Sequence, residues 1–166
     1  MRLISTFLRF TLLSVLLATP VWVTTVWAHE QPAQVVFVCE HGNVKSLIAS
    51  TLFNQTAQKH GLSVRSISRG INPEPDVPAK IADELRKDGT DVSQFKPEAL
   101  TQNDVSGAQR VIAIGVDLNR FKTDESGMIE SWTDIPPASI DYAASRDALL
   151  RHIDILLVEL QANRVK

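Results

Sequence analysis

Hydrophobic residues along the chain form short continuous runs and longer segments with helical spacing. The short runs are rich in β-branched residues and too short for helices, which is typical of strands buried on both faces. A further segment, SVRSIS, alternates between polar and apolar residues as a strand does. Strands are therefore predicted at residues 34–39, 63–68, 110–115 and 129–133. Helices are predicted at residues 46–60, 78–87 and 97–104 and from residue 140 onward.

The ends of the predicted helices carry residue types that are common there. Ser46 suits the N-cap of the first helix and Gly61 suits its end. Pro78 and Pro97 suit the first turns of the next two helices. The last helix carries a hydrophobic stripe on one face, which predicts packing against a sheet, and His152 beside this stripe is expected at the surface. The stripe consists of Leu149, Leu150, Ile153, Leu156, Leu157 and Leu160.

The order of these elements predicts the fold class. Strands that alternate with helices indicate a parallel sheet, because parallel neighbours need crossover connections. We therefore expect an α/β fold, a three-layer sandwich with a central four-stranded parallel sheet flanked by helices, at residues 35–164, after a short polar lead-in at residues 29–34. Ligands of such folds bind at the carboxyl ends of the strands, and Cys39 ends the first predicted strand.

Residues 1–28 have the pattern of a secretory signal peptide. Two arginines precede an apolar run, and the tripeptide VWA closes the segment. Cleavage after Ala28 is expected, which would place the protein in the periplasm or outside the cell, without stable membrane association. The alternative is an uncleaved membrane anchor at residues 10–28, which is nearly long enough to span a bilayer. A proline and several threonines in that segment favour cleavage.

The charge of the chain argues against one class of partner. The full chain has 17 Lys and Arg residues against 19 Asp and Glu residues. Two of the arginines lie in the leader, so 15 positive charges remain against 19 negative ones, a net charge of about −4 after cleavage. A nucleic-acid partner is therefore not expected.

The segment CEHGNVKS, at residues 39–46, has the residues of an oxyanion site. Cys39 is the single cysteine of the chain, so it forms no internal disulfide and is either an inert buried thiol or kept for chemistry. The segment opens a predicted helix, where backbone N–H groups and the helix dipole attract anions. The same field, with Lys45 and the Ser46 hydroxyl, would favour an ionised Cys39 at neutral pH. The Gly-Asn pair tolerates the left-handed backbone of a tight loop. The chemistry implied is attack of a thiolate on a tetrahedral oxyanion centre.

The chain carries the segment VVFVC, followed by five residues, a cation and a serine, just before a predicted helix. This pattern resembles the low-molecular-weight protein tyrosine phosphatases and the arsenate reductases built on that fold. The loop of that family is Cys, five residues, Arg and Ser. The resemblance covers most of residues 35–160. It implies that Cys39 is a nucleophile that forms a phosphocysteine, and that Asp134 is the general acid, with Asp141 as the alternative. No metal or cofactor is expected. The loop amides would hold the phosphoryl oxygens. These phosphate-binding residues are Glu40, His41, Gly42, Asn43, Val44, Lys45 and Ser46.

Two loop residues depart from the family pattern. Lys45 stands where the family has arginine, and a lysine offers a point charge in place of a planar fork, so weak phosphatase activity is expected. Glu40 would repel a dianion unless its side chain points away or pairs with a neighbour such as His41. His41 is itself either an acid-base group at the mouth of the site or a solvent-facing histidine.

Three functions remain open. The leading hypothesis is hydrolysis of an aryl phosphate or phosphotyrosine, in a small molecule or a protein, with Cys39, Lys45 and Asp134 as the catalytic residues. The second hypothesis is arsenate reduction, which needs an external thiol because the chain has no further cysteine. The third is binding of phosphate or another tetrahedral oxyanion without turnover, which Lys45 and Glu40 both favour.

Overall fold

The structure is a computed structural model that describes residues 35–122 and 128–164. The leader expected at residues 1–28 and the lead-in expected at residues 29–34 lie outside the described residues. Within the described ranges, no helix is both long and apolar enough to cross a membrane.

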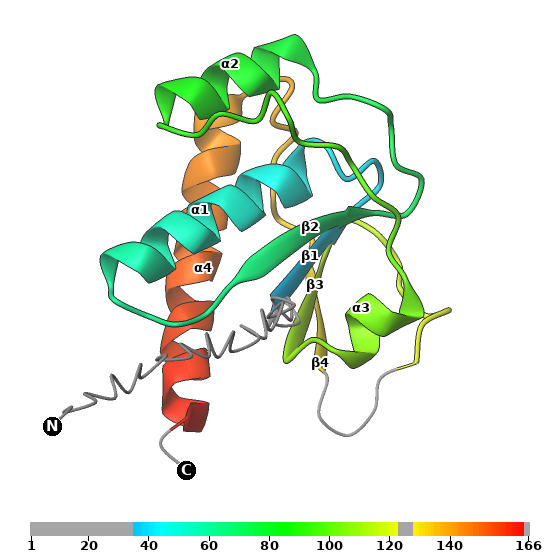
Figure 1. The fold of residues 1–166 in the computed structure, drawn as a ribbon, viewed down its shortest axis with the longest axis vertical. Helices are drawn as coiled ribbons and strands as arrows, with labels where there is room; N and C mark the ends of the chain where they lie inside the picture. Colours follow the sequence, from blue (N-terminus) through cyan, green and yellow to red (C-terminus); the bar gives the residue numbers. More distant parts are fainter. Residues whose placement is uncertain (1–34, 123–127, 165–166) are drawn as a thin grey trace, which may run out of the picture. The chain divides into compact units, whose positions relative to one another are not determined.

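A four-stranded parallel sheet forms the middle layer, in the strand order β2-β1-β3-β4 (Figure 1). The strands are β1 (Val35–Cys39), β2 (Ser66–Gly70), β3 (Arg110–Ile114) and β4 (Met128–Trp132). β1 and β3 are central and buried on both faces, which explains their continuous hydrophobic runs. The predicted α/β class is confirmed. Because β1 has a neighbour on each side, the loop that follows it lies in the middle of the carboxyl edge of the sheet.

Helices cover both faces of this sheet (Figure 1). They are α1 (Lys45–Lys59), α2 (Ala79–Lys87), α3 (Gln102–Ser106) and α4 (Tyr142–Arg164). Phe37, Ile112 and Trp132 point from the strands into the core that α1, α2 and α4 cover. Val36 and Val111 point into the opposite core, beside α3. The alternation of strand side chains thus produces the predicted three layers.

The hydrophobic stripe predicted on the last helix is confirmed in α4. Its residues pack against α1 and the sheet, in one continuous core. Leu150 is half-buried, and the other residues are buried, namely Leu149, Ile153, Leu156, Leu157 and Leu160. This packing of an amphipathic face supplies most of the stability of such a helix.

β2 begins three residues later than its alternating pattern predicts. Ser66 and Ser68 point inward and are buried. The backbone N–H of Ser66 donates to Asn54 Oδ1 at 2.8 Å, and its hydroxyl donates to the Ser50 carbonyl at 3.2 Å. Because α1 supplies hydrogen-bond partners for these polar groups, the two serines occupy the buried face of β2.

The helix predicted from Pro97 is also displaced, since α3 begins after Thr101. Thr101 and Asp104 form a capping box in which Thr101 Oγ1 accepts from the Asp104 N–H and the Asp104 carboxylate accepts from the Thr101 N–H. Just before this box, Ala99 forms a parallel bridge with Gly70 at the end of β2. The box and the strand pairing together outweigh the preference of Pro97 for a first turn.

Candidate active site

The loop between β1 and α1, residues 40–44, rests on the end of β2. Gly42 in this loop has a φ angle of 71°, in the left-handed region that favours glycine. A Cβ atom on Gly42 would lie 2.9 Å from the backbone nitrogen of Gly70, and a Cβ atom on Gly70 would lie 2.8 Å from the backbone nitrogen of Gly42. Two glycines in contact therefore set the position of the loop against the sheet.

Backbone hydrogen bonds orient the peptide groups of this loop. The carbonyl oxygens of Cys39, Glu40 and His41 accept from the N–H groups of residues 71, 72 and 74, at N···O distances of 3.1, 2.8 and 3.2 Å respectively. The N–H of a trans peptide points opposite to its carbonyl, so the following N–H groups point away from this segment. Among the described residues, no backbone acceptor binds the N–H groups of residues 40–44. These groups are available to an anion.

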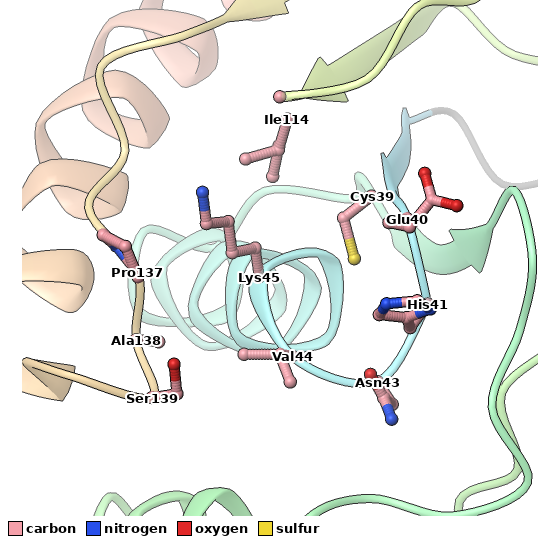
Figure 2. A pocket seen from close by; sticks show the side chains of 11 residues that line it. Cys39, Glu40, His41, Asn43, Val44, Lys45, Ile114, Pro137, Ala138 and Ser139 are labelled. Atoms are coloured by element: carbon pink, nitrogen blue, oxygen red, sulfur yellow. The ribbon is translucent and has the colours of Figure 1, made fainter.

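A pocket of about 260 Å³ opens beside the loop (Figure 2). Cys39 and the loop as far as Lys45 form one side of it. Residues 137–139, which follow β4, and residues 114–115, at the end of β3, form the other. Its apolar lining residues are Val44, Ile114, Pro137 and Ala138. The pocket thus lies at the carboxyl ends of the strands, where the fold class predicts a ligand.

The Cys39 thiol is buried and contacts one hydroxyl group, which is itself hydrogen-bonded to a second. Its Sγ is 3.0 Å from Ser46 Oγ. Ser68 Oγ, on β2, is 2.8 Å from Ser46 Oγ and 3.0 Å from the Gly42 carbonyl oxygen. When the sulfur is ionised, Ser46 donates to it and accepts from Ser68. This serine pair thus holds a hydrogen-bond donor against the sulfur.

Ser46 is not the helix cap that the sequence predicts. It lies in the first turn of α1 and is fully buried, while Val44 occupies the N-cap position without a side-chain hydrogen bond to the helix. The reason is that Cys39 and Ser68 engage the Ser46 hydroxyl, which faces the core instead of the helix end. The first turn of α1 is left without a side-chain acceptor.

Lys45 connects the loop to the opposite wall of the pocket. Its Nζ donates to the carbonyl oxygen of Ile135 at 2.9 Å, across a sequence separation of 90 residues. Figure 2 shows the Lys45 side chain reaching toward the wall at Pro137, away from the sulfur of Cys39. The ammonium group therefore holds the wall segment against the start of α1 and keeps further N–H donors for a ligand.

Two other loop residues that line the pocket hydrogen-bond to the segment that follows β2. The exposed Glu40 carboxylate accepts from Asn72 Nδ2 at 2.6 Å, and Figure 2 shows it turned away from the Cys39 sulfur. This arrangement reduces its repulsion of a bound dianion: the side chain points away, and its hydrogen-bond partner is Asn72 and not His41. The buried Asn43 ties the loop to the next segment, since its Nδ2 donates to Glu74 Oε2 at 2.7 Å and to a backbone carbonyl at 2.8 Å.

The structure does not bring Asp134 to the pocket. Its carboxylate, 64% exposed, accepts from Nε2 of His152 at 2.8 Å. Asp141, the alternative acid, accepts from the Ala144 N–H at 2.9 Å at the start of α4. Residues 137–139 lie between these two aspartates in the sequence and form a wall of the pocket, but they carry no carboxyl group.

His152 is a structural residue of this region that sequence reasoning missed. Its ring stacks on Trp132 with the ring centroids 4.5 Å apart, and its side chain is 28% exposed rather than at the open surface. The sequence holds a signal for this, because residue 152 follows Leu149 by three positions and precedes Leu156 by four, which places it on the buried side of α4. Together, Trp132, His152 and Asp134 anchor the segment that leads into the pocket wall.

Asp134→Asn should leave kcat/KM for an aryl phosphate within about threefold of wild type, whereas loss of a general acid costs about 10²-fold or more. Steady-state kinetics on the purified variant measure this. A loss of two orders of magnitude would instead place Asp134 at the reacting atoms.

The same variant should show a pH-dependent change in stability. The hydrogen bond from His152 lowers the pKa of Asp134 below its ordinary value of 3.8. A group with a lowered pKa in the folded state contributes stability above its unfolded pKa, and this contribution is lost as the pH falls through the folded value. Melting temperatures of wild type and Asp134→Asn should therefore differ at mildly acidic pH and converge below pH 3.8. If the difference in melting temperature stays constant as the pH changes, the ionised carboxylate is not its source.

The chain is similar to known proteins in sequence and in fold. Residues 34–124 match the family described as low molecular weight phosphotyrosine protein phosphatase. The thioredoxin-dependent arsenate reductase Cg_ArsC1' of Corynebacterium glutamicum is 23% identical, with a TM-score of 0.65 over 81% of this chain and 65% of that chain. A low molecular weight protein tyrosine phosphatase from T. tengcongensis is 21% identical, with a TM-score of 0.64 over 76% of this chain and 99% of that chain. One from Bacillus subtilis is 20% identical, with a TM-score of 0.62 over 78% of this chain and 98% of that chain.

At these identities the solved structures establish a shared fold, and phosphatases and an arsenate reductase occur among them. The chain spans 65% of the length of that arsenate reductase. The family match covers more than half of the chain and includes the whole loop around Cys39. The protein therefore belongs to the low molecular weight phosphotyrosine protein phosphatase family.

Proposed function

We propose that the protein hydrolyses aryl phosphate monoesters, phosphotyrosine among them, through a phosphocysteine intermediate on Cys39. The position of Cys39 supports this function: its buried sulfur lies 3.0 Å from Ser46 Oγ, at the base of a loop whose N–H groups have no backbone acceptor among the described residues. The thiolate attacks phosphorus, and the loop N–H groups and the Lys45 ammonium hold the phosphoryl oxygens. Water then attacks phosphorus and releases phosphate and the thiolate.

The walls of the pocket favour an aryl leaving group. Val44, Ile114, Pro137 and Ala138 give the pocket an apolar lining. An aromatic ring would bury apolar surface there, at about 25 cal/mol per Å² removed from water. An alkyl phosphate of small size would make less of this contact, so aryl esters are the preferred class.

Arsenate reduction is the second candidate, and the absence of a carboxyl group from the wall at residues 137–139 favours it. Arsenate loses a hydroxide or water in place of an aryl oxide, so it depends less on a positioned acid. Cys39 would displace that hydroxide to form an S–As bond. An external thiolate would then attack the Cys39 sulfur, which gives a mixed disulfide and transfers two electrons to arsenic to release arsenite. A second external thiol would reduce the mixed disulfide, since Cys39 is the single cysteine.

One set of assays separates these functions. The protein is incubated with para-nitrophenyl phosphate in EDTA, and with arsenate plus glutathione or a thioredoxin. Release of nitrophenol, together with a phosphoryl group on Cys39 in acid-quenched protein, is the expected result. Arsenite release without nitrophenol would select the reductase. Binding of phosphate in calorimetry with no turnover of either substrate would overturn both enzymatic proposals.

Lys45→Arg should raise kcat for para-nitrophenyl phosphate by about tenfold or more, which is about 1.4 kcal/mol off the barrier. An arginine in this position would keep one N–H on the Ile135 carbonyl and offer a planar fork to the phosphoryl oxygens. The gain should appear in kcat more than in KM, because the fork fits the transition state best. No gain in a folded variant would show that the loop is shaped for another ligand.

We further propose that this chemistry takes place outside the cytoplasm. The basic, apolar and small-residue pattern of residues 1–28 supports export. N-terminal sequencing of the exported protein, with His29 as the expected first residue, tests the proposal. A chain that starts at Met1 in the membrane fraction would indicate an anchor.

A further inference from the structure

Cleavage of an aryl phosphate leaves an aryl oxygen that must gain a proton, and a positioned acid contributes about 10²- to 10⁴-fold to such steps. In the described part of the chain, the ionisable side chains that line the pocket are those of Cys39, Glu40, His41 and Lys45. Cys39 is the nucleophile, and Glu40 is held by Asn72. Lys45 donates to a backbone carbonyl of the pocket wall. His41 is the group that remains.

The ring of His41 is oriented by its Nδ1 atom. Nδ1 lies 3.2 Å from the backbone oxygen of Asn72. Because a carbonyl oxygen only accepts hydrogen bonds, Nδ1 carries a proton and donates it. Glu74 Oε1 lies 3.8 Å from the same nitrogen, so a negative charge faces the imidazolium when it forms. Within residues 35–122 and 128–164, no hydrogen-bond or ion-pair partner engages Nε2.

The position of the ring matches the path of the leaving group. Figure 2 shows His41 extending from the loop into the pocket, on the same side as the Cys39 sulfur. A phosphoryl group held by the loop N–H groups points its leaving oxygen away from the sulfur, toward the mouth of the pocket. His41, 49% exposed, lies at that mouth. Asp134 is turned toward His152 instead.

We propose that His41 is the general acid and general base of this site, in the role that the family resemblance gives to an aspartate. The inference rests on the proposed hydrolase function and names the group that moves the protons. A histidine with one nitrogen on an orienting acceptor and the other free for proton transfer is a recurring catalytic arrangement.

The reaction takes two steps. In the first, the Cys39 sulfur forms a bond to phosphorus, the bond between phosphorus and the aryl oxygen breaks, and imidazolium Nε2 of His41 gives its proton to that oxygen. The products are a neutral phenol, phosphocysteine and neutral His41. In the second step, water attacks phosphorus, Nε2 takes the proton of the water, and the S–P bond breaks. Inorganic phosphate leaves, and the thiolate and the imidazolium are restored.

Substrates whose leaving groups differ in basicity can test whether His41 supplies the proton. Phenyl phosphate has a basic leaving oxygen that needs a proton, whereas dinitrophenyl phosphate leaves as a stable anion. In His41→Asn, the amide nitrogen can still donate to the Asn72 carbonyl, but nothing replaces Nε2. In His41→Gln, the amide can reach the position of Nε2 but cannot transfer a proton. His60→Gln, at the exposed end of α1, is the matched control.

Both His41 variants should lose about 10²-fold or more in kcat/KM for phenyl phosphate and at most about threefold for dinitrophenyl phosphate. His60→Gln should resemble wild type with both esters. Equal losses with both esters, or no loss with phenyl phosphate, would overturn the role of His41 and leave the hydrolase function standing. No turnover of either ester by wild type would overturn the proposed function and this inference with it. Melting curves confirm that each variant is folded.

Discussion

Replacing Cys39 by serine should lower kcat/KM for para-nitrophenyl phosphate by about 10⁴-fold or more. The substitution changes one atom in a buried site, and the serine hydroxyl can keep the hydrogen bond to Ser46, so the fold and the loop should persist. The loss arises because a serine hydroxyl is a far weaker acid and a far poorer nucleophile than a cysteine thiol. Stopped assays with high enzyme concentration measure the residual rate.

The single cysteine provides a second form of the same test. Iodoacetamide alkylates thiols much faster than other side chains, and Cys39 is the single cysteine, so under brief treatment the loss of turnover should follow the extent of Cys39 alkylation. Inorganic phosphate should slow the alkylation, because it would occupy the loop above the sulfur. Cys39→Ser protein should still bind phosphate in calorimetry. Turnover that survives either treatment would rule out the phosphocysteine.

Gly42→Ala should lower the free energy of unfolding by about 2–3 kcal/mol and lower kcat/KM by about 10²-fold or more. An alanine would hold a side chain at a φ angle of 71°, and its Cβ would lie 2.9 Å from the backbone nitrogen of Gly70. Relief of that contact requires the loop to rise from the end of β2, which moves its N–H groups away from the Cys39 sulfur. Urea unfolding and steady-state kinetics measure the two effects.

Gly61→Ala is the matched control for this substitution. Gly61 has a similar φ angle of 66°, but a Cβ atom there would meet nothing within 4 Å. The control should therefore cost about 1 kcal/mol of stability and leave kcat/KM unchanged. If Gly42→Ala behaves like Gly61→Ala in both measurements, the contact with Gly70 does not set the position of the loop.

The general architecture could be read from the sequence because it depends on local patterns. The VVFVC run is apolar throughout because β1 is covered on both faces, and the stripe on α4 repeats with the helical period because one side of that helix is buried. The alternation of strands and helices then leaves few arrangements of the sheet. The position of Cys39 at the carboxyl end of the first strand, before a helix, follows from these elements.

Where local patterns compete, tertiary contacts decided the outcome. The alternation in SVRSIS indicates a strand but not which serines point inward, and the hydroxyl and amide groups of α1 decided this for Ser66. The cap-like position of Ser46 is a local signal, but a thiol from β1 and a hydroxyl from β2 engage its side chain. In both cases, a buried polar group took partners that lie far away in the sequence.

The sequence by itself determined the fold class and the loop that surrounds the Cys39 thiol, because both follow from periodicity and from residue types within a short segment. Only the tertiary structure decided which hydrogen-bond partners the other predicted site residues take. Lys45 meets the Ile135 carbonyl, 90 residues away, and Asp134 meets His152 on α4 instead of the pocket. No short-range pattern encodes such pairs, because each depends on the packing of separate elements against one sheet, and that packing leaves His41 facing the pocket.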